Sequence, residues 1–107
     1  LKIKKNNNLV IPDKTPDGKS VLTIGIDAFR NLNKGYDIES IKLPETVTVI
    51  EDYAFQFNNI DKFKMPRDLK KLGMGVFMMS NVTIKSNILI NHASSCANSA
   101  NWKYLLQ

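Results

Sequence analysis

Apolar and polar residues follow the same order in two stretches of the chain, residues 41–55 (IKLPETVTVIEDYAF) and residues 63–77 (FKMPRDLKKLGMGVF). Each stretch opens with apolar-Lys-apolar-Pro, continues with two apolar residues three positions apart, and ends on a small residue followed by Phe. The pair of a small residue and Phe occurs three times, with spacings of 26 and 22 residues between the phenylalanines Phe29, Phe55 and Phe77. A period in the low twenties is typical of a solenoid in which each repeat makes one coil.

Short strands are predicted at the start of each repeat. In residues 41–43 and 63–65 apolar residues alternate with Lys, which is the period of a strand that buries one face. The Pro that follows ends the pairing, because it has no N–H to donate. One coil cannot bury its apolar side chains alone, so we expect equivalent residues of successive coils to stack in columns, one of which contains Phe29, Phe55 and Phe77.

The regions around the repeats predict one domain in three parts. These parts are an opening coil over residues 1–20, repeats over residues 21–90 and a C-terminal cap over residues 91–107. Within the opening part, Asp17-Gly18-Lys19 indicates a hairpin-like turn. Residues 33–36 read as an insertion that follows the first repeat.

The C-terminal cap is predicted to be helical. Helical spacing connects four residues near the end of the chain: Cys96, Ala100, Lys103 and Tyr104. The last coil of a solenoid leaves an apolar face open and needs a cover. We therefore expect Trp102 and Leu105 to pack on that face from the helix.

Residues 38–55 (IESIKLPETVTVIEDYAF) and 60–77 (IDKFKMPRDLKKLGMGVF) resemble the BspA-like, Treponema pallidum-type, leucine-rich repeats. The resemblance implies an α/β leucine-rich-repeat solenoid, with strand-rich parallel coils and short helical turns. It also implies a non-enzymatic bacterial or protozoan protein, secreted or on the cell surface, that acts in adhesion or partner recognition. That family often has Cys shortly after its Ala-Phe pair, where this chain has Leu32, Asn58 and Ser80.

Composition agrees with a globular domain. Of the 107 residues, 43% are hydrophobic and 23% are charged, which excludes a disordered or collagen-like chain. The longest apolar runs are a few residues, too short to span a bilayer. Leu1 is not an initiator Met and no apolar leader follows it, so we expect a mature or excised segment. Cys96 is the only cysteine, which excludes a disulfide within the chain.

Charge provides the first candidate site. The net charge is +5, and all ten carboxylates lie between Asp13 and Asp68. Lys42, Lys64 and Lys85 are the outward residues of three successive predicted strands, which places their side chains about 4.8 Å apart on one sheet face. We hypothesise that they contact an acidic surface, such as a carboxylated glycan, an anionic cell-wall polymer or an acidic protein. The alternative is that they only keep the protein soluble.

A second candidate contact is apolar. Phe57, Met78 and Met79 follow the repeated Phe, and Tyr36 lies in the insertion. We expect these side chains to pack against the adjacent coil. The alternative is that Phe57 and Met79 form an exposed strip, of the kind that marks a contact site. The exposure of Phe57 separates the two interpretations.

No catalytic, cofactor or metal site is predicted. His92 and Cys96 would share one face of a helix, but the sequence marks neither an orienting group nor an oxyanion hole. One His and one Cys fall short of a four-ligand metal site. Asn81-Val82-Thr83 matches a glycosylation sequon, which we attribute to chance. The basic residues lack a reader motif, so nucleic acid is not an expected partner.

The leading hypothesis is a non-catalytic module that binds a protein, an extracellular matrix or an acidic glycan surface, without a cofactor and without membrane insertion. The expected ligand contacts are Lys42, Lys64, Lys85, Tyr36 and Phe57. One alternative is a structural spacer or capping segment of a larger multi-domain surface protein, with no ligand of its own. Another is a targeting module joined to a cell-wall enzyme.

Overall fold

The computed structural model describes residues 7–34, 38–85 and 101–105. Within these ranges the chain forms eight short strands and one 3-10 helix, η1 (Leu32–Lys34). The strands are β1 (Asn8–Val10), β2 (Thr23–Ile24), β3 (Ser40–Lys42), β4 (Val49–Ile50), β5 (Asn59–Lys64), β6 (Lys71–Leu72), β7 (Asn81–Lys85) and β8 (Asn101–Leu105).

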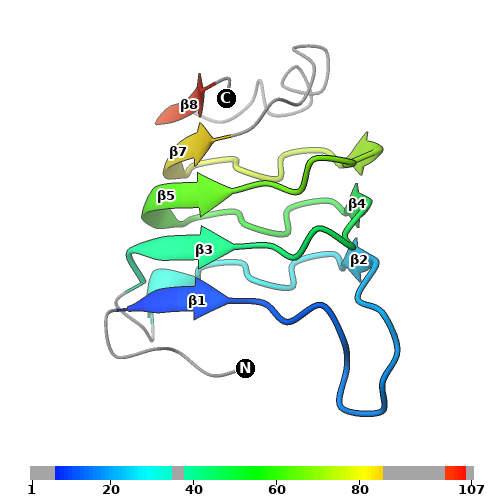
Figure 1. The fold of residues 1–107 in the computed structure, drawn as a ribbon. Helices are drawn as coiled ribbons and strands as arrows, with labels where there is room; N and C mark the ends of the chain where they lie inside the picture. Colours follow the sequence, from blue (N-terminus) through cyan, green and yellow to red (C-terminus); the bar gives the residue numbers. More distant parts are fainter. Residues whose placement is uncertain (1–6, 35–37, 86–100, 106–107) are drawn as a thin grey trace.

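The strands form two parallel sheets on two sides of the molecule (Figure 1). One sheet has five strands in the order β1-β3-β5-β7-β8, and the other has three in the order β2-β4-β6. Because the chain visits the two sheets alternately from β1 to β7, each circuit makes one coil. We call residues 8–34 the first coil, residues 38–58 the second coil and residues 59–80 the third coil. Figure 1 shows these coils lying one on another.

The strand register explains which side chains are buried. Leu9 lies opposite Ile41 and Ile41 opposite Phe63, and all three are buried. Their neighbours Lys42 and Lys64 lie opposite each other and are exposed. The alternation predicted for the two repeats is therefore confirmed, with the apolar side chains inside the coils.

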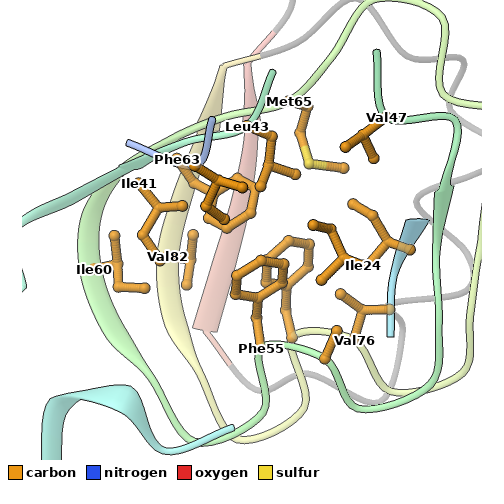
Figure 2. Close-up of a cluster of buried hydrophobic side chains, with 14 of the residues drawn as sticks. Ile24, Ile41, Leu43, Val47, Phe55, Ile60, Phe63, Met65, Val76 and Val82 are labelled. Atoms are coloured by element: carbon orange, nitrogen blue, oxygen red, sulfur yellow. The ribbon is translucent and has the colours of Figure 1, made fainter. Parts of the chain in front are cut away.

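The phenylalanines of the three repeats form the predicted column. The ring centroids of Phe29 and Phe55 are 5.4 Å apart and those of Phe55 and Phe77 are 5.9 Å apart, with both pairs stacked. Phe63 meets the rings of Phe55 and Phe77 edge-on, with centroids 4.7 and 5.1 Å away. Figure 2 shows Phe55 and Phe63 within this apolar interior, among Ile24 and other labelled side chains. Aromatic pairs of these geometries contribute about 0.5–1.5 kcal/mol each beyond their burial.

Each coil leads from the three-stranded sheet back to the five-stranded sheet through a series of turns. We call the stacked turns of residues 27–31, 53–57 and 75–79 the turn ladder. Two positions in each coil have a positive φ, between 53° and 61°. One lies two residues before the repeated Phe and the other two residues after it: Asp27, Asn31, Tyr53, Phe57, Gly75 and Met79. The N–H groups of alternate residues donate to carbonyl oxygens of the next coil, as Phe29 does to Ala54 at 2.8 Å and Phe55 does to Val76 at 3.0 Å. The bonds of this turn ladder all run from the earlier coil to the later one.

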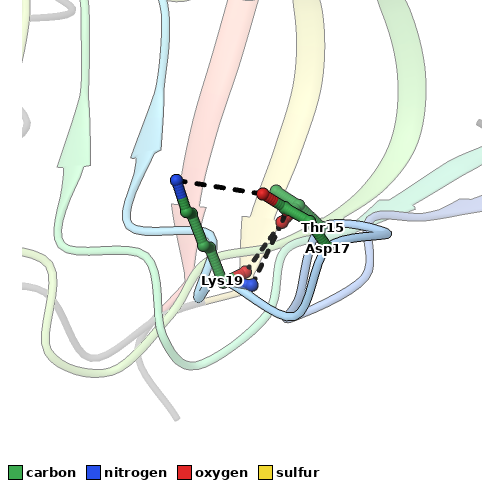
Figure 3. A network of polar contacts seen from close by, with 3 residues as sticks. All are labelled: Thr15, Asp17 and Lys19. Atoms are coloured by element: carbon green, nitrogen blue, oxygen red, sulfur yellow. Dashed lines mark hydrogen bonds and ion pairs between the residues drawn. The ribbon is translucent and has the colours of Figure 1, made fainter.

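A hairpin interrupts the first coil between β1 and β2. The Thr15 N–H donates to the Lys19 carbonyl at 2.8 Å, and Gly18 has a φ of 86°, which glycine adopts readily. The Thr15 hydroxyl donates to the Asp17 carboxylate, which lies 3.8 Å from the Lys19 ammonium. Figure 3 shows this ion pair and the Thr15 hydroxyl bonded to the Lys19 backbone. The predicted hairpin-like turn is confirmed. Helix η1 covers the first two residues of the insertion predicted at residues 33–36, and the other two lie outside the described residues.

The predicted C-terminal helix is wrong over residues 101–105. These residues form β8, which runs parallel to β7, with Trp102 opposite Val82 and Tyr104 opposite Ile84. The sequence NWKYL places Lys103 between two aromatic residues, so it fits a strand period as well as a helical one. Pairing with β7 also satisfies backbone groups that the edge of that strand would otherwise expose. Cys96 and Ala100 of the predicted helix lie outside the described residues.

Candidate ligand-binding face

Three lysines share one row across neighbouring strands of the five-stranded sheet. Backbone pairing places Lys42 opposite Lys64 and Lys64 opposite Lys85, and we call these residues the lysine row. Lys42 and Lys64 are exposed, and neither forms an ion pair with a described side chain. For Lys85 only the backbone position is described. The register thus agrees with the predicted arrangement, and ligand contact by these lysines stays a prediction.

A second row of opposite charge lies on the same face. Glu39 and Asp61 precede Lys42 and Lys64 by three residues and are exposed. Three residues of a strand span about 10 Å. The outward face therefore carries two carboxylates near the start of β3 and β5, where Lys62 is also exposed, and the lysine row near the ends of these strands.

The described residues of this face line three shallow hollows. The largest, of about 420 Å³, lies where β1 and β3 end, and its lining includes Val10, Pro12, Lys42 and Pro44. We call it the proline hollow. A second, of about 220 Å³, is bounded by residues of β3 and β5 that include Lys42 and Lys64. A third, of about 330 Å³, lies near the start of β3 and β5, and its lining includes Glu39, Asp61 and Lys62. A broad surface of this kind suits an extended macromolecule better than a small molecule, which needs a deeper pocket.

Glu45 and Arg67 form an ion pair next to the lysine row. The Arg67 Nε lies 3.3 Å from the Glu45 Oε2, and the Arg67 backbone N–H donates to the same oxygen at 3.1 Å. The backbone hydrogen bond, more than the Arg67 side chain and the nearby Lys64 charge, holds the pKa of Glu45 below its ordinary value. Because both side chains are exposed, the pair contributes little to stability. Its main effect is to compensate the negative charge of Glu45.

The apolar strip at Phe57 and Met79 is exposed. Phe57 is 41% exposed and Met79 is 59% exposed, so the expectation that both pack against the adjacent coil is wrong. Met78 is partly buried, and its sulfur accepts a hydrogen bond from the Gln56 side chain. The Arg30 guanidinium lies over the Phe57 ring, 5.3 Å from its centroid. The strip lies on the turn ladder, outside the sheet face, and Phe57 as a ligand contact stays a prediction.

Two buried polar residues were not predicted. Asn58 and Ser80 stand where the resembling family often has Cys, and both are almost fully buried. The Asn58 side-chain N–H groups donate to the carbonyls of Phe29 at 2.9 Å and Phe55 at 2.8 Å, while its oxygen accepts from the Leu32 N–H at 2.8 Å. The Ser80 hydroxyl donates to the Phe55 carbonyl at 2.8 Å and accepts from the Asn58 N–H. These bonds link all three coils, and their equivalent repeat positions were the signal that could have revealed them.

Among the described residues, no group of three or more His, Cys, Asp or Glu side chains is placed to hold a metal ion. The described part of the chain contains no helix with the length and apolar character needed to cross a membrane. His92, Cys96 and Tyr36 lie outside the described residues, so the predictions made for them stay predictions.

Comparison with protein families agrees with this architecture. The family model of the BspA type leucine rich repeat region matches residues 4–105, in six copies. The matched range contains all the strands described above, including β8, which had been predicted to belong to a helical cap. No curated protein and no solved structure matches the chain.

Proposed function

Because this chain belongs to the BspA-type leucine-rich repeat family, we propose that it is a non-catalytic protein-binding module, folded as a short solenoid. In this proposal the partner contacts the outward face of the five-stranded sheet. The module serves adhesion or partner recognition, as part of a secreted or cell-surface protein. Stacked repeats present extended faces of this kind, which leucine-rich and other repeat proteins use for binding.

One observation carries the proposal, namely the lysine row beside the proline hollow. Ammonium groups about 4.8 Å apart repel each other by roughly 0.9 kcal/mol per pair even in bulk water. An acidic partner removes this repulsion and adds attraction, so the arrangement favours a bound anion over an empty face. Lysines that served only solubility would not need to share one row.

The test measures binding and its dependence on salt. The protein is titrated against purified extracellular-matrix proteins and against carboxylated and sulfated glycans, at low and moderate ionic strength. We expect a ligand whose affinity falls with salt, and we expect Lys42→Gln/Lys64→Gln to weaken binding and flatten that dependence. Lys70→Gln/Lys71→Gln is the matched control, because it removes two exposed charges near β6 in the other sheet.

The outcome also distinguishes the spacer. If the Lys42 and Lys64 variant binds every probe as the unaltered protein does, the sheet face is not the binding surface. If no probe binds, a structural spacer with no ligand of its own becomes the better account. Removal of a spacer would then change the stability of the parent protein and leave recognition unaltered.

A further inference from the structure

The proline hollow gives the lysine row an apolar end. β1 places Val10 opposite Lys42, and Val10 is 37% exposed. Pro12 and Pro44 line the hollow beside it. Along four neighbouring strands the row therefore reads Val10, Lys42, Lys64 and Lys85, which is one apolar position followed by three basic positions.

The charges around the hollow largely balance one another, so this end attracts an acidic group less than the middle of the lysine row does. Asp13 and Glu45 also line the proline hollow, and the Glu45 charge is compensated by Arg67 whereas Asp13 forms no ion pair with a described side chain. Lys42, at the border of the hollow, is balanced by Asp13, so a ligand carboxylate is attracted more strongly toward Lys64 than toward the hollow. At the start of β3 and β5, Glu39 and Asp61 outnumber the exposed Lys62, so an acidic ligand is favoured along the lysine row.

We propose that the sheet face binds an extended acidic segment of polypeptide, which places one apolar side chain in the proline hollow and its carboxylates along the lysine row. This ligand class rests on the proposed function. Burial of the apolar side chain between Val10 and the prolines fixes the position of the segment. The lysines then favour one direction of the segment, because its acidic part is attracted toward Lys64.

A polypeptide fits this face better than a glycan. Sugar rings usually stack on exposed aromatic rings, and the described outward residues of β1, β3 and β5 include none, because Phe63 points into the core. The exposed ring of Phe57 lies outside the sheet. Alternate side chains of an extended peptide repeat about every 7 Å, and the flexible stems of lysine can adapt to that spacing.

The experiment is a selection from a display library of random 12-residue peptides against the folded protein. We expect the enriched peptides to combine several Asp or Glu with an apolar residue toward one end. Selected synthetic peptides should bind Lys42→Gln/Lys64→Gln about 2- to 30-fold more weakly, since each exposed ion pair adds a few-fold to affinity. Lys70→Gln/Lys71→Gln should bind them within about two-fold of the unaltered protein.

A second pair of variants tests the hollow. Val10→Ser should weaken binding about 3- to 10-fold by removing part of the apolar wall. Leu22→Ser is its control, because Leu22 is also exposed and does not line the hollow. Thermal unfolding of each variant confirms that the fold is retained.

The outcomes separate this proposal from the one on which it rests. An absence of enriched peptides, or peptides without acidic bias, overturns the polypeptide ligand. If anionic glycans nevertheless bind in a way that depends on Lys42 and Lys64, the sheet face remains the binding surface. If no probe depends on those lysines, both proposals fail.

Discussion

The first coil and the two coils above it carry the same pattern and bury it to different extents. Phe55 and Phe77 are fully buried, whereas the equivalent Phe29 is only partly buried. Ala54 is fully buried, and the equivalent Ala28 is exposed. The sequence of a repeat therefore determines which of its side chains are apolar, whereas the coils stacked beside it determine how far those side chains are buried. Stability should therefore be distributed unevenly along the stack, as expected for nearest-neighbour interfaces.

The largest expected effect comes from the phenylalanine column. Phe55→Ala removes a ring that contacts Phe29, Phe63 and Phe77, and it should lower the free energy of unfolding by about 3–5 kcal/mol. Phe29→Ala should lower it by about half as much, because part of that ring is already in water. Urea unfolding followed by circular dichroism measures both. Equal losses would contradict the difference between the coils.

Asn58 should be the next most sensitive position. Asn58→Ala leaves the carbonyls of Phe29 and Phe55 and the N–H of Leu32 without their side-chain partner, at an expected loss of about 2–4 kcal/mol. The control is Asn81→Ala, at an exposed site, which should change stability by less than about 0.5 kcal/mol. Urea unfolding followed by circular dichroism measures the loss of stability in both variants. A neutral Asn58→Ala would show that water replaces these bonds without loss.

Two glycines at equivalent positions give a sharper comparison. A Cβ at Gly73 would lie 2.6 Å from the Asp52 backbone nitrogen and 2.7 Å from the Glu51 carbonyl carbon, whereas at Gly25 the nearest atom is 3.8 Å away. We expect Gly73→Ala to lower stability by about 1–3 kcal/mol, because a backbone must move. Gly25→Ala should be neutral or slightly stabilising, since alanine restricts the unfolded chain. Comparable melting temperatures for the two variants would contradict the close approach of the third coil to the second.

The left-handed positions allow an exchange between coils. Asn31 and Met79 occupy equivalent positions with φ of 53° and 56°, and Asn tolerates this conformation better than Met. Met79→Asn should therefore raise stability by about 0.5–1 kcal/mol, and Asn31→Met should lower it by a similar amount. Differential scanning calorimetry of the two variants checks the signs. Stabilisation by Asn31→Met would remove the explanation based on backbone conformation.

The smallest effect is expected at Glu45. Its pKa is lowered in the folded state, so its contribution to stability is present above the ordinary value of 4.5 and is lost as the pH falls through the lowered pKa. Because the carboxylate is largely exposed, that contribution should stay below about 1 kcal/mol. Urea unfolding of Glu45→Gln and the unaltered protein from pH 7 to pH 3 measures it. A difference that grows toward low pH would contradict the assigned cause.

The sequence predicted the structural features that follow from the spacing of apolar residues along the chain. Alternation around Lys42 and Lys64 revealed the strands, and the repeated Phe revealed the column, because both patterns depend on spacing alone. Trp102-Lys103-Tyr104 was assigned to a helix because so short a segment fits the helical period as well as the strand period. Pairing with β7 makes it a strand. The burial of Asn58 was missed, since its partners are carbonyls that only the stacked turns bring together.

The candidate site was predictable in part. The lysine row follows from strand register, so the alignment of Lys42 with Lys64 could be expected from sequence. The proline hollow could not be predicted, because Val10 and Pro44 come from different coils and line one hollow only when the coils stack. The exposure of Phe57 was also missed, since no rule of composition indicates that a Phe will adopt a left-handed turn.

The uniform direction of the turn ladder has an electrical consequence. A trans peptide points its carbonyl opposite to its N–H, so the units that donate from Asp27, Phe29 and Asn31 all have their dipoles aligned with the stacking axis. Antiparallel pairing would cancel such dipoles, and here they add, as they do along a helix. The third coil thus carries the partially positive pole and the first coil the partially negative pole, and each added repeat would separate the two poles further.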